Sequence, residues 1–79
     1  MVSRDPSDYW LTTHAKQRRR ERGISCRAIA AAIKAGDVRS THESDARLFV
    51  STHDDVPGRY GVVADLNSGA IKTVEHRSR

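Results

Sequence analysis

The stretch Thr13-His14-Ala15-Lys16-Gln17-Arg18-Arg19-Arg20-Glu21-Arg22-Gly23-Ile24-Ser25 organises the interpretation of the whole chain. It predicts a short, strongly basic helix, capped by Thr12 or Thr13, that ends at Gly23, with Ser25 as the N-cap of a second helix. Because His14, Arg18 and Arg22 are spaced four residues apart, they share one side of the first helix. We call these three residues the basic ridge. It is the first candidate for a functional surface.

The positive charge of the chain is concentrated around this ridge. The protein has 79 residues and a net charge of +4. Between residues 14 and 34, seven basic side chains are accompanied by one glutamate. A basic helical region on an otherwise balanced small domain is typical of proteins that bind polyanions such as nucleic acids. The alternative is that these charges form an ordinary solvated helix face.

Several classes of protein are not favoured by the sequence. No run of eighteen apolar residues is present, so we expect no membrane span and no membrane partner. The N-terminus lacks the apolar segment of a signal peptide, and the single cysteine, Cys26, cannot form an internal disulfide. We therefore expect a cytoplasmic protein.

The second helix is expected from about Cys26 to Ala35. Cys26, Ile29 and Ile33 recur on one apolar side, with Ala30 beside them, so Cys26 is predicted to be a small core residue. After Val38 the pattern changes to that of strands, which are expected near 38–43, 47–53, 59–65 and 70–76.

Short connections between these strands predict an antiparallel meander. The fold class is therefore α+β, with two N-terminal helices followed by a four-stranded antiparallel sheet. The domain is expected to span residues 11–76, with flexible tails at residues 1–10 and 77–79. The strands at 47–53 and 59–65 contain continuous apolar runs, so they are expected to be central.

Metal and cofactor chemistry is not indicated by the residue spacing. The histidines and the cysteine, at positions 14, 26, 42, 53 and 76, contain no close pair of ligands. No phosphate-binding glycine loop, nucleophile elbow or Ser-His-Asp set is present either. We therefore predict no metal ion and no cofactor.

Cleavage of RNA without a metal ion needs a general base, a general acid and cations around the phosphate. His14 is the acid–base candidate, and Arg18 and Arg22 are candidate phosphate contacts. The second proton-transfer group would come from the sheet, with Glu75 or His76 as the leading candidates. His42 and Tyr60 are further candidates for proton transfer, and Lys16, Arg19, Arg47, Arg59 and Lys72 for contacts to RNA.

Purely structural roles stay open for the same side chains. His14, near a helix start, could hydrogen-bond to a backbone or sheet group. Arg22, next to Gly23, is favourably placed at the negative end of the helix.

The pattern His-x-x-x-Arg-x-x-x-Arg-Gly-Ile-Ser, which begins here at His14, resembles a small prokaryotic domain of unknown function. That domain is usually placed with the RelE/BrnT-type toxins of type II toxin–antitoxin systems. The resemblance continues through Gly36-Asp37-Val38, Arg-Leu-Phe-Val at 47–50 and Gly-Ala-Ile-Lys-Thr-Val at 69–74, and so covers about residues 12–76.

The resemblance implies a compact sheet with helices packed on it, mRNA cleavage with or without the ribosome, and an antitoxin partner from the same operon. Relatives with known activity tend to place basic and acid–base residues on their C-terminal strands. This chain departs from that pattern, because its final strand has Lys72, Glu75 and His76 but no arginine before Arg77. Two other functions remain open. The basic first helix could bind nucleic acid or an acidic protein without catalysis, or the strand at 38–43 could be a sheet edge that pairs with a partner strand.

Overall fold

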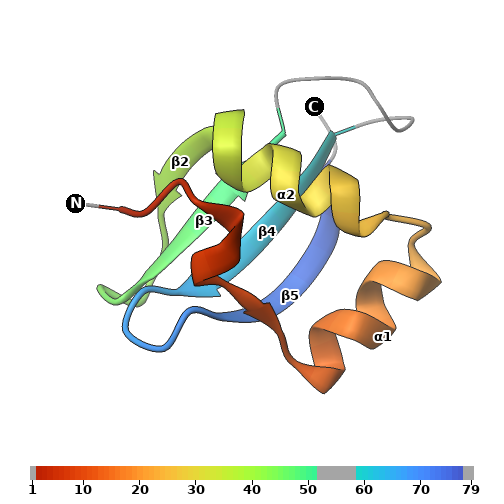
Figure 1. The fold of residues 1–79 in the computed structure, drawn as a ribbon, viewed down its shortest axis with the longest axis horizontal. Coiled ribbons are helices and arrows are strands. Elements are labelled where there is room, and N and C mark those ends of the chain that lie inside the picture. Colours follow the sequence, from red (N-terminus) through yellow and green to blue (C-terminus); the bar gives the residue numbers. More distant parts are fainter. Residues whose placement is uncertain (1, 52–58, 78–79) are drawn as a thin grey trace.

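The computed structural model of the chain describes residues 2–51 and 59–77, with the side chains of Arg59 and Arg77 left aside. Two α-helices and five strands make up an α+β fold, which confirms the predicted class (Figure 1). In chain order the elements are η1 (Pro6–Asp8), β1 (Trp10–Leu11), α1 (Thr13–Glu21), α2 (Cys26–Ala35), β2 (Asp37–Ser40), β3 (Ala46–Val50), β4 (Arg59–Asp65) and β5 (Ala70–Arg77).

The sheet is mixed and has five strands in the order β1-β5-β4-β3-β2. Strands β2 to β5 pair antiparallel, whereas β1 pairs parallel with β5. The predicted four-stranded antiparallel meander is therefore wrong, because it missed β1, which precedes the helices. Two residues are too few to show an alternating pattern, and the pairing of Trp10 with Ala70 joins segments far apart in the sequence.

The strands expected at 38–43 and 47–53 are shorter in the structure, at Asp37–Ser40 and Ala46–Val50. Residues 52 and 53 of the second expectation lie outside the described residues. In β5, Ile71 pairs with Ala64 and Thr73 pairs with Val63, so Lys72 is an extra residue in the ladder. This irregularity lets both Ile71 and Val74 face the core.

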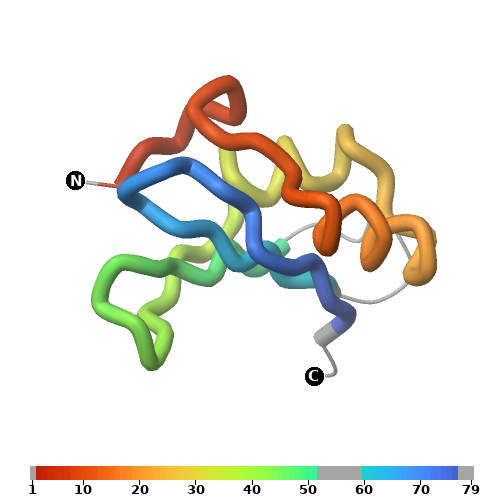
Figure 2. Tube along the Cα trace, turned by 90° about the horizontal axis from the view of Figure 1, so that it is seen from below, coloured from red at the N-terminus to blue at the C-terminus, as the bar shows by residue number. Residues whose placement is uncertain are grey.

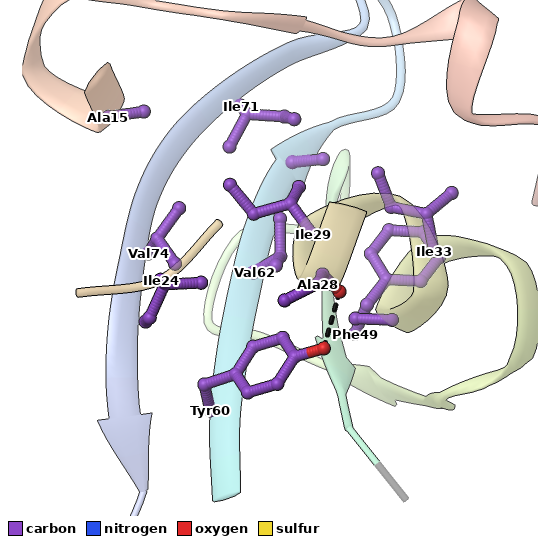
Figure 3. Packing of buried hydrophobic residues seen from close by; sticks show 12 residues of the cluster. Ala15, Ile24, Ala28, Ile29, Ile33, Phe49, Tyr60, Val62, Ile71 and Val74 are labelled. Carbon is purple, nitrogen blue, oxygen red and sulfur yellow. Dashed lines mark hydrogen bonds between the residues drawn. The ribbon is translucent and has the colours of Figure 1, made fainter. Parts of the chain in front are cut away.

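Both helices lie on the same side of the sheet, with α1 against β5 and α2 against β3 and β4 (Figures 1 and 2). No helix in the described part of the chain is long and apolar enough to cross a membrane. Among the described residues, twelve form the core between the layers, and Figure 3 labels most of them. They are Ala15, Ile24, Ala28, Ile29, Ala32, Ile33, Phe49, Tyr60, Val62, Ala64, Ile71 and Val74.

The buried side of α2 differs from the predicted one. Cys26 is exposed, so its prediction as a core residue is wrong. Ile29 and Ile33 are buried as predicted, and Ala28 and Ala32 are buried with them, whereas Ala30 is only partly buried. The small alanines of α2 allow a close approach to the sheet, and the hydroxyl of Tyr60 in β4 donates a hydrogen bond to the carbonyl oxygen of Ala28 (Figure 3).

The helix ends follow the sequence pattern closely. The side chain of Thr12 caps α1 by accepting from the N–H of Ala15, and Ser25 caps α2 by accepting from the N–H of Ala28. Gly23 has φ of +65°, the left-handed conformation that ends a helix without strain only at glycine. Ile24 follows it into the core and is 1% exposed.

Arg4 and Tyr9 make specific contacts with the domain, in a segment that the sequence suggested to be a flexible tail. Arg4 donates from Nε to the carbonyl of Ile33 at 2.7 Å and from Nη2 to the carbonyl of Gly36. These carbonyls lie at the C-terminal end of α2, where a helix leaves its acceptors unpaired. The ring of Tyr9 also packs edge-on against Phe49, with centroids 5.7 Å apart.

Candidate functional site

The basic ridge starts with a direct contact between its first two members. Arg18 donates from Nε to Nε2 of His14 at 3.5 Å, and its Nη1 pairs with Oε1 of Glu21 at 3.0 Å. His14 is exposed, and Arg18 is partly exposed. A ring nitrogen that accepts a hydrogen bond carries no proton, so this contact requires a neutral His14 with its proton on Nδ1.

The third member of the ridge is bound to the sheet. Arg22, the C-cap of α1, donates from Nη1 to the carbonyl oxygen of Val74 in β5 at 3.3 Å. In return, Nε2 of His76 donates to the carbonyl oxygen of Arg22 at 2.8 Å. We call this pair of hydrogen bonds the α1–β5 clamp. It joins a predicted phosphate contact and a predicted catalytic residue in one structural arrangement.

His14 and His76 lie at opposite ends of α1. Eight residues separate His14 from Arg22, which corresponds to a rise of about 12 Å along the helix axis. Because His76 contacts the backbone of Arg22, the two imidazoles do not converge on one point. The predicted acid–base pair of His14 and His76 is therefore not brought together.

Glu75 belongs to the other face of the sheet, which carries a shallow hollow of about 530 Å³. Its floor is formed by Leu48 and Val63, which are directly opposite each other in β3 and β4. We call it the open-face hollow. Its lining residues are Ser40, Thr41, His42, Leu48, Val63 and Glu75. Two proton-transfer candidates, His42 and Glu75, thus share a site that excludes the basic ridge.

Lys72, a predicted RNA contact, forms an ion pair with Glu43, so its positive charge is already neutralised by a carboxylate. Its Nζ lies 2.5 Å from Oε2 of Glu43, in the connection between β2 and β3. This hydrogen bond raises the pKa of Lys72 above its ordinary value, and the charges of Glu43 and Asp65 act in the same direction. The ammonium group therefore lies beside a carboxylate of this connection, in an exposed ion pair.

The other predicted RNA contacts differ in how accessible they are. Arg19 donates from Nη1 to the carbonyl of Ile24, and its buried Nε has no hydrogen-bond partner among the described residues. Arg47 donates to the carbonyls of Ser44 and Ala46, both at 2.8 Å. Arg59 is described only by its backbone. Lys16, in contrast, is exposed and makes no ion pair within the described residues.

Arg20 is a cation that the sequence analysis did not single out. It is exposed, and no ion pair holds it in the part of the chain that the structure describes. Its spacing of four residues from Lys16 is the signal that could have identified it, because the two share one side of α1. The outer surface of α1 thus has two basic rows, Lys16–Arg20 and His14–Arg18, with Gln17 and Glu21 between them.

Among the described residues, no three His, Cys, Asp or Glu side chains gather as a metal site. Residues 11–76 match the model of a family described as a domain of unknown function, DUF4258. This chain belongs to the DUF4258 family. The DUF4258 match begins in β1 and includes the basic ridge, the α1–β5 clamp and the open-face hollow. Comparisons with curated proteins and with solved structures gave no significant match.

Proposed function

We propose that this DUF4258 protein is a toxin of a type II toxin–antitoxin system, similar to the RelE/BrnT-type toxins, and that it cleaves RNA without a metal ion or cofactor. Its partners would be RNA, free or on the ribosome, and an antitoxin from the same operon. The observation that carries the proposal is the contact of Arg18 with His14 on an exposed side of α1. It joins a proton-transfer group to a phosphate-binding group.

The chemistry follows from the state of these two side chains. Once Arg18 has released it, the unprotonated Nε2 of His14 accepts the proton of the 2′-hydroxyl, whose oxygen then attacks the adjacent phosphorus. Arg18 offers two parallel donors to the phosphate oxygens, where negative charge develops. Arg18 must first exchange Glu21 for the phosphate, and this exchange is easy because the ion pair is exposed and worth little.

The departing 5′-oxygen also needs a proton. Glu75 and His76 were the predicted donors, but Glu75 lines the open-face hollow and His76 is bonded to the carbonyl of Arg22. We therefore propose that water donates this proton and that His14 is the single proton-transfer residue of the ridge.

The test measures cleavage of RNA by the purified protein in the presence of a chelator. We expect His14→Ala to lower the cleavage rate by about 10²–10⁴-fold. Arg18→Ala should also be strongly impaired, and Arg18→Lys should recover only part of the rate because it lacks the paired donors. His42→Ala and Arg39→Ala are matched controls away from α1. A loss in His42→Ala that equals the loss in His14→Ala would move the reaction to the open-face hollow.

A second candidate function is binding of nucleic acid or of an acidic protein through the outer surface of α1, without catalysis. It is favoured by the separation of His14 from Glu75 and His76. The two functions differ in one readout. A toxin arrests growth and fragments RNA when its expression is induced, whereas a binding module retains RNA and leaves it intact. Intact RNA with wild-type protein that binds it would therefore replace the first proposal by the second.

A further inference from the structure

Strand β2 forms one edge of the sheet. It is last in the strand order, and among the described strands it pairs only with β3. Within the described residues no strand covers its outer edge, whose backbone groups could pair with another strand. Asp37 and Arg39 are exposed on this strand and make no ion pair within the described residues. Val38, between them, is half-buried and packs against the core beside Phe49.

We propose that a second copy of this chain pairs antiparallel with β2, so that the two sheets join edge to edge around a two-fold axis at Val38. The hydrogen-bonding pattern of the backbone restricts where the two-fold axis can lie. Residues that are opposite each other in an antiparallel ladder either both direct their N–H and C=O groups to the partner or both direct them away. This direction alternates along a strand. A symmetric pair must therefore be centred on a residue, and a centre between two residues is forbidden.

Charge selects one of the permitted centres. A pair centred on Asp37 places two carboxylates opposite each other, and one centred on Arg39 does the same with two guanidinium groups. A pair centred on Ser40 extends past the end of the strand. Centring on Val38 places each Asp37 opposite Arg39 of the partner subunit, which gives two attractive cross-strand pairs.

The two faces of this pair agree with the rest of the sheet. Asp37 and Arg39 alternate with Val38, so both ion pairs lie on the face opposite the helices. The two Val38 side chains meet on the helix side, where Val38 already packs against the core. Because β2 has only four residues, we expect a concentration-dependent equilibrium of monomer and dimer rather than a permanent dimer.

The test is sedimentation velocity of the full chain over a range of protein concentrations. The wild-type protein should dimerise as concentration rises. Asp37→Arg and Arg39→Asp each place like charges opposite each other, so each should raise the dissociation constant by about tenfold or more. Mixing the two variants in equal amounts should restore association, because one chain then has two positive positions and the other two negative ones. The doubly substituted chain should also dimerise.

Asp45→Arg is the matched control, since it makes the same change of charge at an exposed turn position between β2 and β3. It should dimerise like the wild type, and circular dichroism checks that every variant is folded. The proposal is overturned if the wild-type protein stays monomeric at all concentrations, or binds only an extended segment of another protein. A dimer that ignores both charge reversals, or a mixture that fails to associate, overturns it equally.

Discussion

His76 donates a hydrogen bond of 2.8 Å from Nε2 to the carbonyl oxygen of Arg22. Because a carbonyl only accepts, this nitrogen carries the proton. The acceptor lies at the C-terminal end of α1, where helix carbonyls lack partners within the helix. The side chain of Arg22 also donates to the carbonyl of Val74. The backbone and the side chain of Arg22 therefore both bind β5. The orientation of the basic ridge depends on these bonds.

Replacing His76 should therefore reduce stability. We expect His76→Ala to lower the free energy of unfolding by about 0.5–1.5 kcal/mol, the usual net value of one hydrogen bond. Urea denaturation measures this change. His42→Ala, which removes an exposed imidazole from the opposite face, should stay within about 0.5 kcal/mol of wild type. Equal stability of the two variants would show that the clamp contributes nothing.

The hydroxyl of Tyr60 is a second structural contact that can be tested. Tyr60 is 2% exposed, and its hydroxyl donates to the carbonyl of Ala28 in α2 (Figure 3). Tyr60→Phe keeps the ring and should cost about 1 kcal/mol. Tyr9→Phe is the matched control, because the hydroxyl of Tyr9 donates to Ser3 at a partly buried site. We expect a smaller loss in chemical denaturation there, and a larger one would contradict the ranking.

Gly36 and Gly23 should respond differently to alanine. A Cβ atom at Gly36 would lie 2.5 Å from the carbonyl oxygens of Ala32 and Val50, both fixed in the backbone. We expect Gly36→Ala to cost about 3 kcal/mol or more. At Gly23 nothing lies within 4 Å, and only the positive φ is unfavourable, so Gly23→Ala should cost about 1 kcal/mol. Thermal denaturation shows which of the two variants loses more stability. Gly23→Asn should lose less than Gly23→Ala, because asparagine tolerates this φ better.

The carboxyl of Asp65 provides a test of pH dependence. The Ser68 hydroxyl, 2.6 Å from Oδ2 of Asp65, and then the Ser68 N–H, 2.9 Å away, lower the pKa of Asp65 below its ordinary 3.8. A depressed pKa stabilises the fold above about 3.8, and this stability is lost as pH falls through the lower folded value. Ser68→Ala should raise the pKa of Asp65 toward 3.8, which an NMR titration of this carboxyl detects. An unchanged titration would assign the shift to other groups.

The outer surface of α1 makes its own prediction about RNA affinity. Lys16 and Arg20 are exposed cations without ion pairs in the described part of the chain. If each contacts one phosphate, Lys16→Ala and Arg20→Ala should each reduce the slope of log affinity against log salt by about 0.7–1. Lys34→Ala, at the end of α2, is the charge-matched control and should leave the slope unchanged. Equal slopes in all variants would exclude these contacts.

Local patterns in the sequence predicted the helix ends and the ridge. The caps at Thr12 and Ser25, the left-handed turn at Gly23 and the contact between His14 and Arg18 each involve residues no more than four positions apart. Such interactions depend on the helix repeat and on side-chain chemistry, both of which can be derived from the sequence. The buried side of α2 was harder to predict, because the apolar surface of this helix is broad and its packing against the sheet determines which part is buried. Cys26 was misplaced for this reason.

The sequence by itself therefore determined the α+β class, the two capped helices and the basic ridge on the first of them. Only the tertiary structure decided that β1 pairs with β5, that Glu75 lines the open-face hollow and that His76 bonds to the end of α1. The physical reason is that successive residues of a strand point to opposite faces of the sheet. One extra residue such as Lys72 therefore changes which side chains share a face, and so a site. That register is set by pairing between distant segments and by packing against the helices, which no local pattern contains.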